Sequence, residues 1–210
     1  MKILILGDSF SDPTWATNNY KAWPELLADQ YEVTNLSVCG SSLWWSYTQF
    51  LKNKNQYDLV IFVVTVPNRV YLEEDNLHLN INTRTAFAHT TLENIYYRFF
   101  YSEGKEQFFH NSIVDDIMKH KQVLVIPAFA ESVASYTGVS LCHFSDMEAD
   151  FYKKDRPVLN DTQRKCHLSK ESNHTVYEKI IDAIDNNDKI LYLSENDFIN
   201  PAGPITYYWK

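Results

Sequence analysis

The sequence is poor in glycine and cysteine and contains no long hydrophobic run. Five of its 210 residues are glycines and three are cysteines, Cys39, Cys142 and Cys166. Three cysteines cannot all pair within one chain, and none of them has the short paired spacing of a zinc site. No apolar run approaches the roughly 20 residues needed to span a bilayer. We therefore expect free thiols in a reducing compartment and no membrane partner.

Basic residues are also scarce relative to acidic ones. The chain has 27 Asp and Glu against 19 Lys and Arg, which gives a net charge of −8 at pH 7. A negatively charged chain is not attracted electrostatically to a phosphate backbone, which argues against nucleic acid as a partner. Because the first predicted strand begins at residue 2, we expect no cleavable leader and a cytoplasmic location.

Residues that commonly hold metals do not fall into a ligand pattern. Five histidines share no ligand spacing with carboxylates or cysteines: His78, His89, His110, His120 and His143. We therefore expect neither a metal ion nor another cofactor. Aromatic residues, in contrast, make up 15% of the chain. That content fits surfaces that bind sugars or partners, and it equally fits an aromatic-rich core.

The apolar runs predict the fold class. A chain of 210 residues suits a single domain with one core. Short apolar runs rich in β-branched residues predict strands, with a weaker one at Glu32–Val38: Lys2–Leu6, Leu59–Val64 and Gln122–Ile126. Helical patterns follow the strands, so the crossovers are right-handed and the sheet is parallel. We predict an α/β fold, a three-layer α/β/α sandwich with a mainly parallel central sheet.

Helical periodicity and capping residues place the helices. The expected helices are Ala22–Gln30, Leu43–Leu51, Thr85–Phe100, Glu106–His120 and Lys170–Ile184. Ser169 is a plausible N-cap for the last of them. The weakly periodic segments Tyr71–Arg84 and Ala130–Pro157 are expected to be loops or lids near a site. The tail, from about residue 198 to Lys210, is expected to be an irregular arm of the single domain.

The most informative segment follows the first predicted strand. Gly7-Asp8-Ser9-Phe10-Ser11-Asp12 places a serine where a buried strand ends, and open α/β sheets keep their chemistry at that edge. A serine hydroxyl becomes an effective nucleophile only beside a base and oxyanion donors. The alternative for Ser9 is a helix N-cap.

This segment resembles the first block of the SGNH (GDSL-type) hydrolase family, in particular small phage or bacterial members. Tyr20–Leu27 resembles the family's Trp-Pro helix start, and Asn35–Ser42 resembles its second block, with the glycine at Gly40. His167–Asn173 resembles its last block. The resemblance implies that Ser9 is the nucleophile and His167 the base, with the backbone N–H groups of Ser9 and Gly40 as oxyanion donors.

The third block departs from the family pattern. The family has Gly-x-Asn there, whereas this chain has Thr65-Val66-Pro67-Asn68-Arg69, with the asparagine one residue late. Asn68 is either a third oxyanion donor or the residue that closes a Pro-Asn turn.

The third member of the triad is also altered. The family's aspartate lies three residues before the histidine, where this chain has Arg164. A guanidinium cannot accept the imidazole N–H. Either Asp161 takes that role, or a backbone carbonyl orients the ring and the enzyme is a Ser-His dyad.

The sequence predicts a serine esterase that removes a small acyl group, such as acetyl, from a carbohydrate or related small alcohol. Trp15, Trp44 and Arg69 are candidates for substrate binding, although each tryptophan is equally suited to the core. A sugar O-acyltransferase, a lysophospholipase and a thioesterase stay open as alternatives. So does a catalytically weakened binding or structural module. The sequence does not indicate an oligomeric state.

Overall fold

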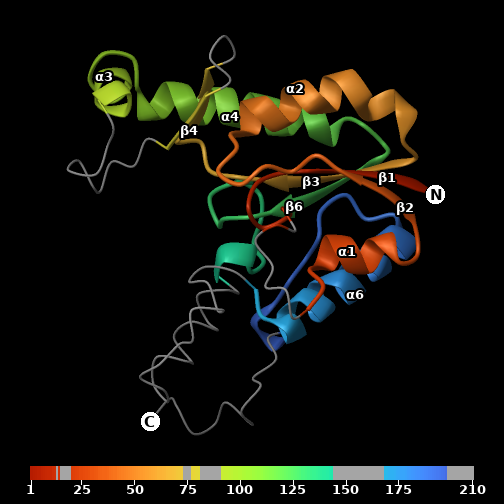
Figure 1. Ribbon diagram of the computed structural model, residues 1–210. Helices are drawn as coiled ribbons and strands as arrows, with labels where there is room; N and C mark the ends of the chain where they lie inside the picture. The colour runs from red at the N-terminus through yellow and green to blue at the C-terminus, as the bar shows by residue number, and fades with distance from the viewer. Residues whose placement is uncertain (13, 15–19, 73–76, 81–90, 144–167, 198–210) are drawn as a thin grey trace, which may run out of the picture.

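A parallel sheet lies at the centre of the molecule (Figure 1). The computed structural model describes all residues except 13, 15–19, 73–76, 81–90, 144–167 and 198–210. The strands lie in the order β2 (Glu32–Asn35), β1 (Lys2–Leu6), β3 (Leu59–Val64) and β6 (Val123–Pro127), and all pairs are parallel. Val125 of β6 also forms a parallel bridge with Ile190, which continues the sheet beyond β6.

Burial explains why β1, β3 and β6 form the middle of the sheet. Nearly every residue of these strands is inaccessible to solvent, so apolar side chains are needed on both faces. Continuous runs of valine, isoleucine and leucine are typical of a parallel sheet covered on both sides. The predicted strands Lys2–Leu6 and Leu59–Val64 are confirmed without change.

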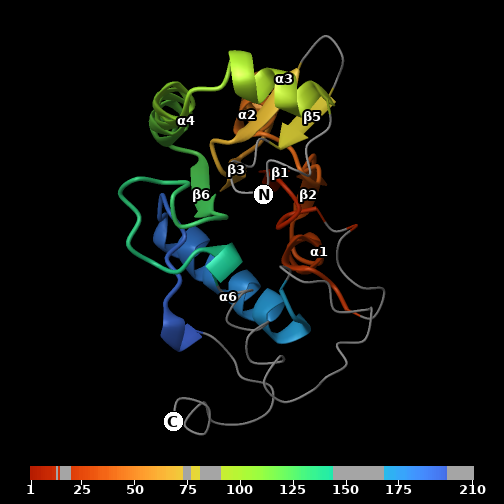
Figure 2. The same cartoon turned by 90° about the vertical axis from the view of Figure 1, so that its left-hand side faces the viewer.

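Helices cover both faces of the sheet, as Figures 1 and 2 show. On one face lie α1 (Trp23–Ala28) and α6 (Lys170–Asn186), and on the other lie α2 (Leu43–Asn53) and α4 (Glu103–Met118), with α3 (Thr91–Phe99) beside α4. Alternate residues of β1 enter different cores: Ile3 and Ile5 pack with α1 and α6 side chains, and Leu4 and Leu6 pack with those of α2 and α4. The predicted three-layer sandwich is therefore confirmed.

Helix α6 shows how local sequence sets an element's bounds. The Ser169 hydroxyl accepts a hydrogen bond from the Ser172 N–H at 3.1 Å, which confirms the predicted N-cap. Asn187 ends the helix with a φ of 56°, a left-handed conformation that asparagine tolerates. Val176 and Ile180 are fully buried on the face that packs against the sheet.

The prediction of a loop over Tyr71–Arg84 was wrong for its first part. The structure forms an antiparallel hairpin there, from β4 (Arg69–Leu72) and β5 (Leu77–Asn80). Both strands alternate apolar and polar residues over only four positions, a period-two signal too short to stand out in a polar segment. In the other expected loop, Ala130–Pro157, residues 130–143 form turns and a short helical segment. The rest of that loop and the tail from residue 198 lie outside the described residues.

The strand order places a topological switch point between β1 and β3. From β1 the chain crosses to β2 on one side, and from β3 it crosses to β6 on the other. Ligands of open α/β sheets bind outside the carboxyl ends of the strands at this point. The turns that follow β1, β2 and β3 therefore form the edge where a functional site is expected.

Gly7 allows the turn after β1 to lie against β3. A Cβ atom at this position would lie 2.5 Å from Val63 Cβ and 2.5 Å from Ser11 Oγ.

We predict that Gly7→Ala lowers the free energy of unfolding by about 1–3 kcal/mol, because the extra methyl group overpacks this contact. Gly104→Ala is the matched control: a Cβ there meets no atom within 4 Å, and alanine in the first turn of α4 should be neutral or stabilising by up to about 1 kcal/mol. Urea unfolding of both variants tests this, and equal stabilities would contradict it.

Candidate active site

Ser9 begins a tight helical turn directly after β1. The Asp8 carbonyl accepts hydrogen bonds from the N–H groups of Ser11 and Asp12, both at 3.0 Å, and these bonds close the turn. Ser9 itself is half-buried. Neither its hydroxyl nor its N–H makes a hydrogen bond within the described part of the chain. Both groups are therefore available to a ligand.

The neighbouring carboxylate of Asp8 holds this turn in place. Asp8 is fully buried, and its Oδ2 accepts hydrogen bonds from Thr65 Oγ1 at 2.9 Å and Arg69 Nη1 at 2.6 Å. Its Oδ1 accepts a hydrogen bond from the Phe10 N–H at 3.1 Å. A buried carboxylate requires such partners to offset the loss of water. Asp8 thus joins the turn after β1 to the segment after β3.

The turn after β2 is joined to the same place. Ser41 Oγ and the Val38 N–H both donate to the Gly7 carbonyl, at 2.8 and 3.1 Å. Asp12 Oδ2 accepts a hydrogen bond from the Cys39 N–H at 3.0 Å. Gly40 has a φ of 76°, a left-handed conformation that favours glycine. Among the described residues its N–H has no hydrogen-bond acceptor, which fits the predicted oxyanion role.

Asn68 lies in the tight turn between β3 and β4. The turn is closed by a backbone hydrogen bond from the Arg69 N–H to the Val66 carbonyl, so the Asn68 side chain is not needed to close it. Its Oδ1 is buried and has no hydrogen-bond partner within the described part of the chain. This oxygen is an acceptor, whereas the predicted oxyanion role would use the Nδ2 donor of the same amide, at the carboxyl end of β3.

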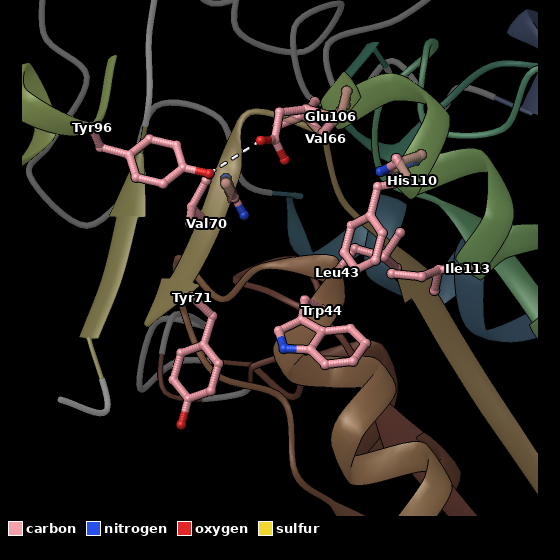
Figure 3. Close-up of a pocket in the computed structure, with 12 residues that line it drawn as sticks. Leu43, Trp44, Val66, Val70, Tyr71, Tyr96, Glu106, His110 and Ile113 are labelled. Carbon is pink, nitrogen blue, oxygen red and sulfur yellow. Dashed lines mark hydrogen bonds between the residues drawn. The ribbon is translucent and has the colours of Figure 1, made fainter. Parts of the chain in front are cut away.

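Trp44 and Arg69, two of the residues predicted to bind substrate, line one cavity (Figure 3). The cavity has a volume of about 200 Å³ and is bordered by α2, α4 and β4. The Arg69 guanidinium also lies 5.5 Å from the centre of the Phe129 ring and carries the ion pair to Asp8. Arg69 is thus shared between the cavity and the Ser9 turn. Sequence reasoning gave no sign of its pairing with Asp8.

The other predicted site residues lie outside the described part of the chain. These are Trp15, Asp161 and His167, and Arg164 lies in the same undescribed segment as the last two. The residue that follows His167 is described, however: Leu168 is buried, and its carbonyl accepts hydrogen bonds from Tyr20 Oη at 2.9 Å and Asn173 Nδ2 at 3.1 Å. His174, the other histidine near the end of the chain, is exposed on α6, and its Nε2 lies 3.5 Å from Glu178 Oε1.

A chain of hydrogen bonds links Leu168 to the Ser9 turn. Asn173 Oδ1 accepts a hydrogen bond from the Trp23 N–H at 3.0 Å. The Trp23 indole Nε1 donates to the Phe10 carbonyl at 2.8 Å. These bonds connect the residue after His167 to the residue after Ser9 through Asn173 and Trp23. Trp23 and Asn173 lie in two of the segments that resemble family blocks, and nothing in the sequence indicates that they bond to each other.

The described residues contain no group of three or more His, Cys, Asp or Glu side chains that could hold a metal ion. Within the same residues, no helix combines the length and the apolarity needed to cross a bilayer.

Comparison with known proteins found distant structural similarity. No protein-family model and no curated protein matches the chain. It resembles the solved structures of TesA (13% identity, 89% of this chain and 99% of that one, TM-score 0.41) and an acetyl xylan esterase (17%, 94% and 80%, 0.40). It also resembles the psychrotrophic esterase EstA from Pseudoalteromonas sp. (14%, 88% and 97%, 0.42). Similarity at this level carries no argument about activity, so the function is argued below from this chain's own residues.

The Asp8–Arg69 ion pair should be important for stability. We predict that Asp8→Asn lowers the free energy of unfolding by about 3–5 kcal/mol, because the largely buried guanidinium loses its counter-charge. Asp29→Asn is the matched control: Lys21 and Asp29 are also 2.6 Å apart but about half exposed, and loss of that pair should cost at most about 1 kcal/mol. Chemical denaturation measures both values. Similar losses in the two variants would contradict a structural role for the buried pair.

Proposed function

We propose that this protein is a serine esterase in which Ser9 is the nucleophile. One observation carries the proposal: at the switch point of the sheet, the hydroxyl and N–H of Ser9 have no hydrogen-bond partner among the described residues. Hydrogen bonds join the turn of Ser9 to those of Gly40 and Asn68. A nucleophile with donors beside it is the arrangement that acyl transfer requires.

In the proposed acylation step, Ser9 Oγ attacks the ester carbonyl while His167 takes the hydroxyl proton. The oxyanion of the tetrahedral intermediate accepts hydrogen bonds from the N–H groups of Ser9 and Gly40 and from the Asn68 side-chain amide. His167 then returns the proton to the leaving alcohol as its bond to the carbonyl carbon breaks. In the second step, water attacks the acyl-Ser9 ester, and His167 again transfers the proton.

The proposed substrate is a small acyl ester, such as an acetyl ester, of a carbohydrate or related alcohol. Two features support it. The cavity beside the Ser9 turn is small, about 200 Å³, and its lining combines aromatic rings with polar groups. The polar part of this lining, which includes Arg69, Glu106 and His110, suits the alcohol part of such an ester, because polar groups in a pocket fix the orientation of a polar ligand.

The nucleophile can be identified directly. We predict that a fluorophosphonate probe labels the protein once and that Ser9→Ala abolishes both labelling and hydrolysis of 4-nitrophenyl acetate, because the covalent route is lost. Ser112→Ala is the control, since Ser112 is an exposed serine on α4, remote from the sheet edge, whose hydroxyl donates to the Phe108 carbonyl. It should keep full labelling. An unlabelled wild-type protein would favour the binding-module alternative.

A further experiment asks whether the site is a triad. If Asp161 accepts the second N–H of His167, Asp161→Asn should lower kcat by up to about four decades, because the imidazole then takes the wrong tautomer. In that case Arg164→Asp, which restores the family spacing, should recover part of the activity in the double variant. A loss below about tenfold in Asp161→Asn would contradict the triad and leave a Ser-His dyad.

A further inference from the structure

The cavity beside the Ser9 turn contains a buried histidine with an unused acceptor. His110, on α4, is 3% exposed, and its Nε2 lies 2.8 Å from the Ser132 carbonyl. A carbonyl only accepts hydrogen bonds, so Nε2 carries the proton and Nδ1 has the lone pair. Nδ1 is buried and has no partner among the described residues. Buried polar groups are almost always hydrogen-bonded, so a lone pair without a described partner, on a residue that lines a cavity, leaves an acceptor for a ligand to use.

The charges that line the cavity are already compensated. The Arg69 guanidinium is paired with Asp8. Glu106 Oε1 lies 3.1 Å from Lys105 Nζ and accepts a hydrogen bond from the Tyr96 hydroxyl, also at 3.1 Å (Figure 3). Burial lowers the pKa of His110, which keeps the imidazole neutral. No lining charge is left without a counter-charge, so the cavity favours an uncharged ligand over an anion or a cation.

The remaining lining offers flat apolar surfaces beside these acceptors. The rings of Trp44 and Phe109 lie with their centres 5.4 Å apart at 48°, and Figure 3 shows the Trp44 indole at the border of the cavity. Glu106 Oε2 adds a second acceptor that no described residue uses. A sugar ring has hydroxyl groups, which donate to such acceptors, and C–H faces, which pack on aromatic rings. At about 200 Å³ the cavity is smaller than sites for drug-sized ligands, which start at about 300 Å³.

Two residues of the cavity lining connect it to the turns of the candidate active site. Arg69 reaches from the cavity to Asp8, the residue before Ser9. Trp44 lies in the first turn of α2, just after the Gly40 turn. The two walls of the cavity thus continue from the two turns that carry the proposed oxyanion donors.

We propose that this cavity binds a single uncharged sugar ring, the alcohol part of the ester, and that His110 Nδ1 accepts a hydrogen bond from one of its hydroxyls. The inference rests on the proposed function, in which Ser9 attacks the acyl group. His110 is then a specificity-determining residue that holds the substrate and takes no part in proton transfer.

The test compares two acetyl esters, a mono-O-acetylated methyl hexopyranoside and 4-nitrophenyl acetate, which has no sugar hydroxyls. His110→Gln keeps a donor near the Nε2 position for the Ser132 carbonyl and removes the Nδ1 acceptor. We expect it to raise KM for the sugar ester about tenfold, the equivalent of one hydrogen bond, with kcat/KM for 4-nitrophenyl acetate changed less than twofold. His120→Gln, outside the cavity, should change neither. Equal effects of His110→Gln on both esters, or on neither, would overturn the inference.

Two further arms separate this inference from the proposed function. Glu106→Gln repeats the test on a less buried residue and covers the case in which His110→Gln does not fold. Calorimetric titration of the Ser9→Ala protein with the same sugar ester measures binding without turnover. Weaker binding of the sugar ester to the Ser9→Ala/His110→Gln protein than to the Ser9→Ala protein would support the sugar site. If the wild-type protein hydrolyses neither ester, only the proposed esterase activity is overturned. Hydrolysis of 4-nitrophenyl acetate without binding of the sugar ester would overturn the site and leave the esterase.

Discussion

The Asp8 carboxylate is fully buried, and its contacts join the segments on which the candidate site is built. It accepts hydrogen bonds from Thr65 and Arg69 after β3 and from the Phe10 N–H within its own turn. The Asp8 carbonyl closes the turn that presents Ser9. A buried charge with three donors resists rearrangement, because losing any donor leaves the carboxylate underpaired. The geometry at Ser9 therefore depends on the loop that carries Asn68 and on the arginine that lines the adjacent cavity.

Sequence reasoning predicted the frame of the molecule. The strands β1, β3 and β6 were predictable because strands buried on both faces need continuous apolar runs, and α6 was predictable from the Ser169 cap. Gly40 was predictable from the family block, and its φ of 76° gives the physical reason for a glycine there. The β4–β5 hairpin was missed because its period-two pattern spans only four residues in each strand.

Long-range pairings were beyond the sequence. Asp8 and Arg69 are 61 positions apart, and Trp23 and Asn173 are 150 apart, and nothing local to either residue specifies its partner. The unused lone pair of His110 was equally hidden, because it follows from how Ser132 meets the ring in three dimensions. These contacts connect the turn of Ser9, the residue after His167 and the cavity, so the tertiary structure adds the arrangement that residue types alone do not carry.

The most direct test of the account is a crystal structure of the protein after reaction with a small alkyl fluorophosphonate. The account predicts phosphorus bonded to Ser9 Oγ, with the phosphoryl oxygen about 2.7–3.1 Å from the backbone nitrogens of Ser9 and Gly40 and facing the Asn68 amide. It also predicts that the alkoxy group of the adduct, which stands for the alcohol part of the ester, lies toward the cavity lined by Trp44. An adduct on another residue, or a phosphoryl oxygen that points away from both N–H groups, would contradict the central claim that these three turns form one oxyanion site.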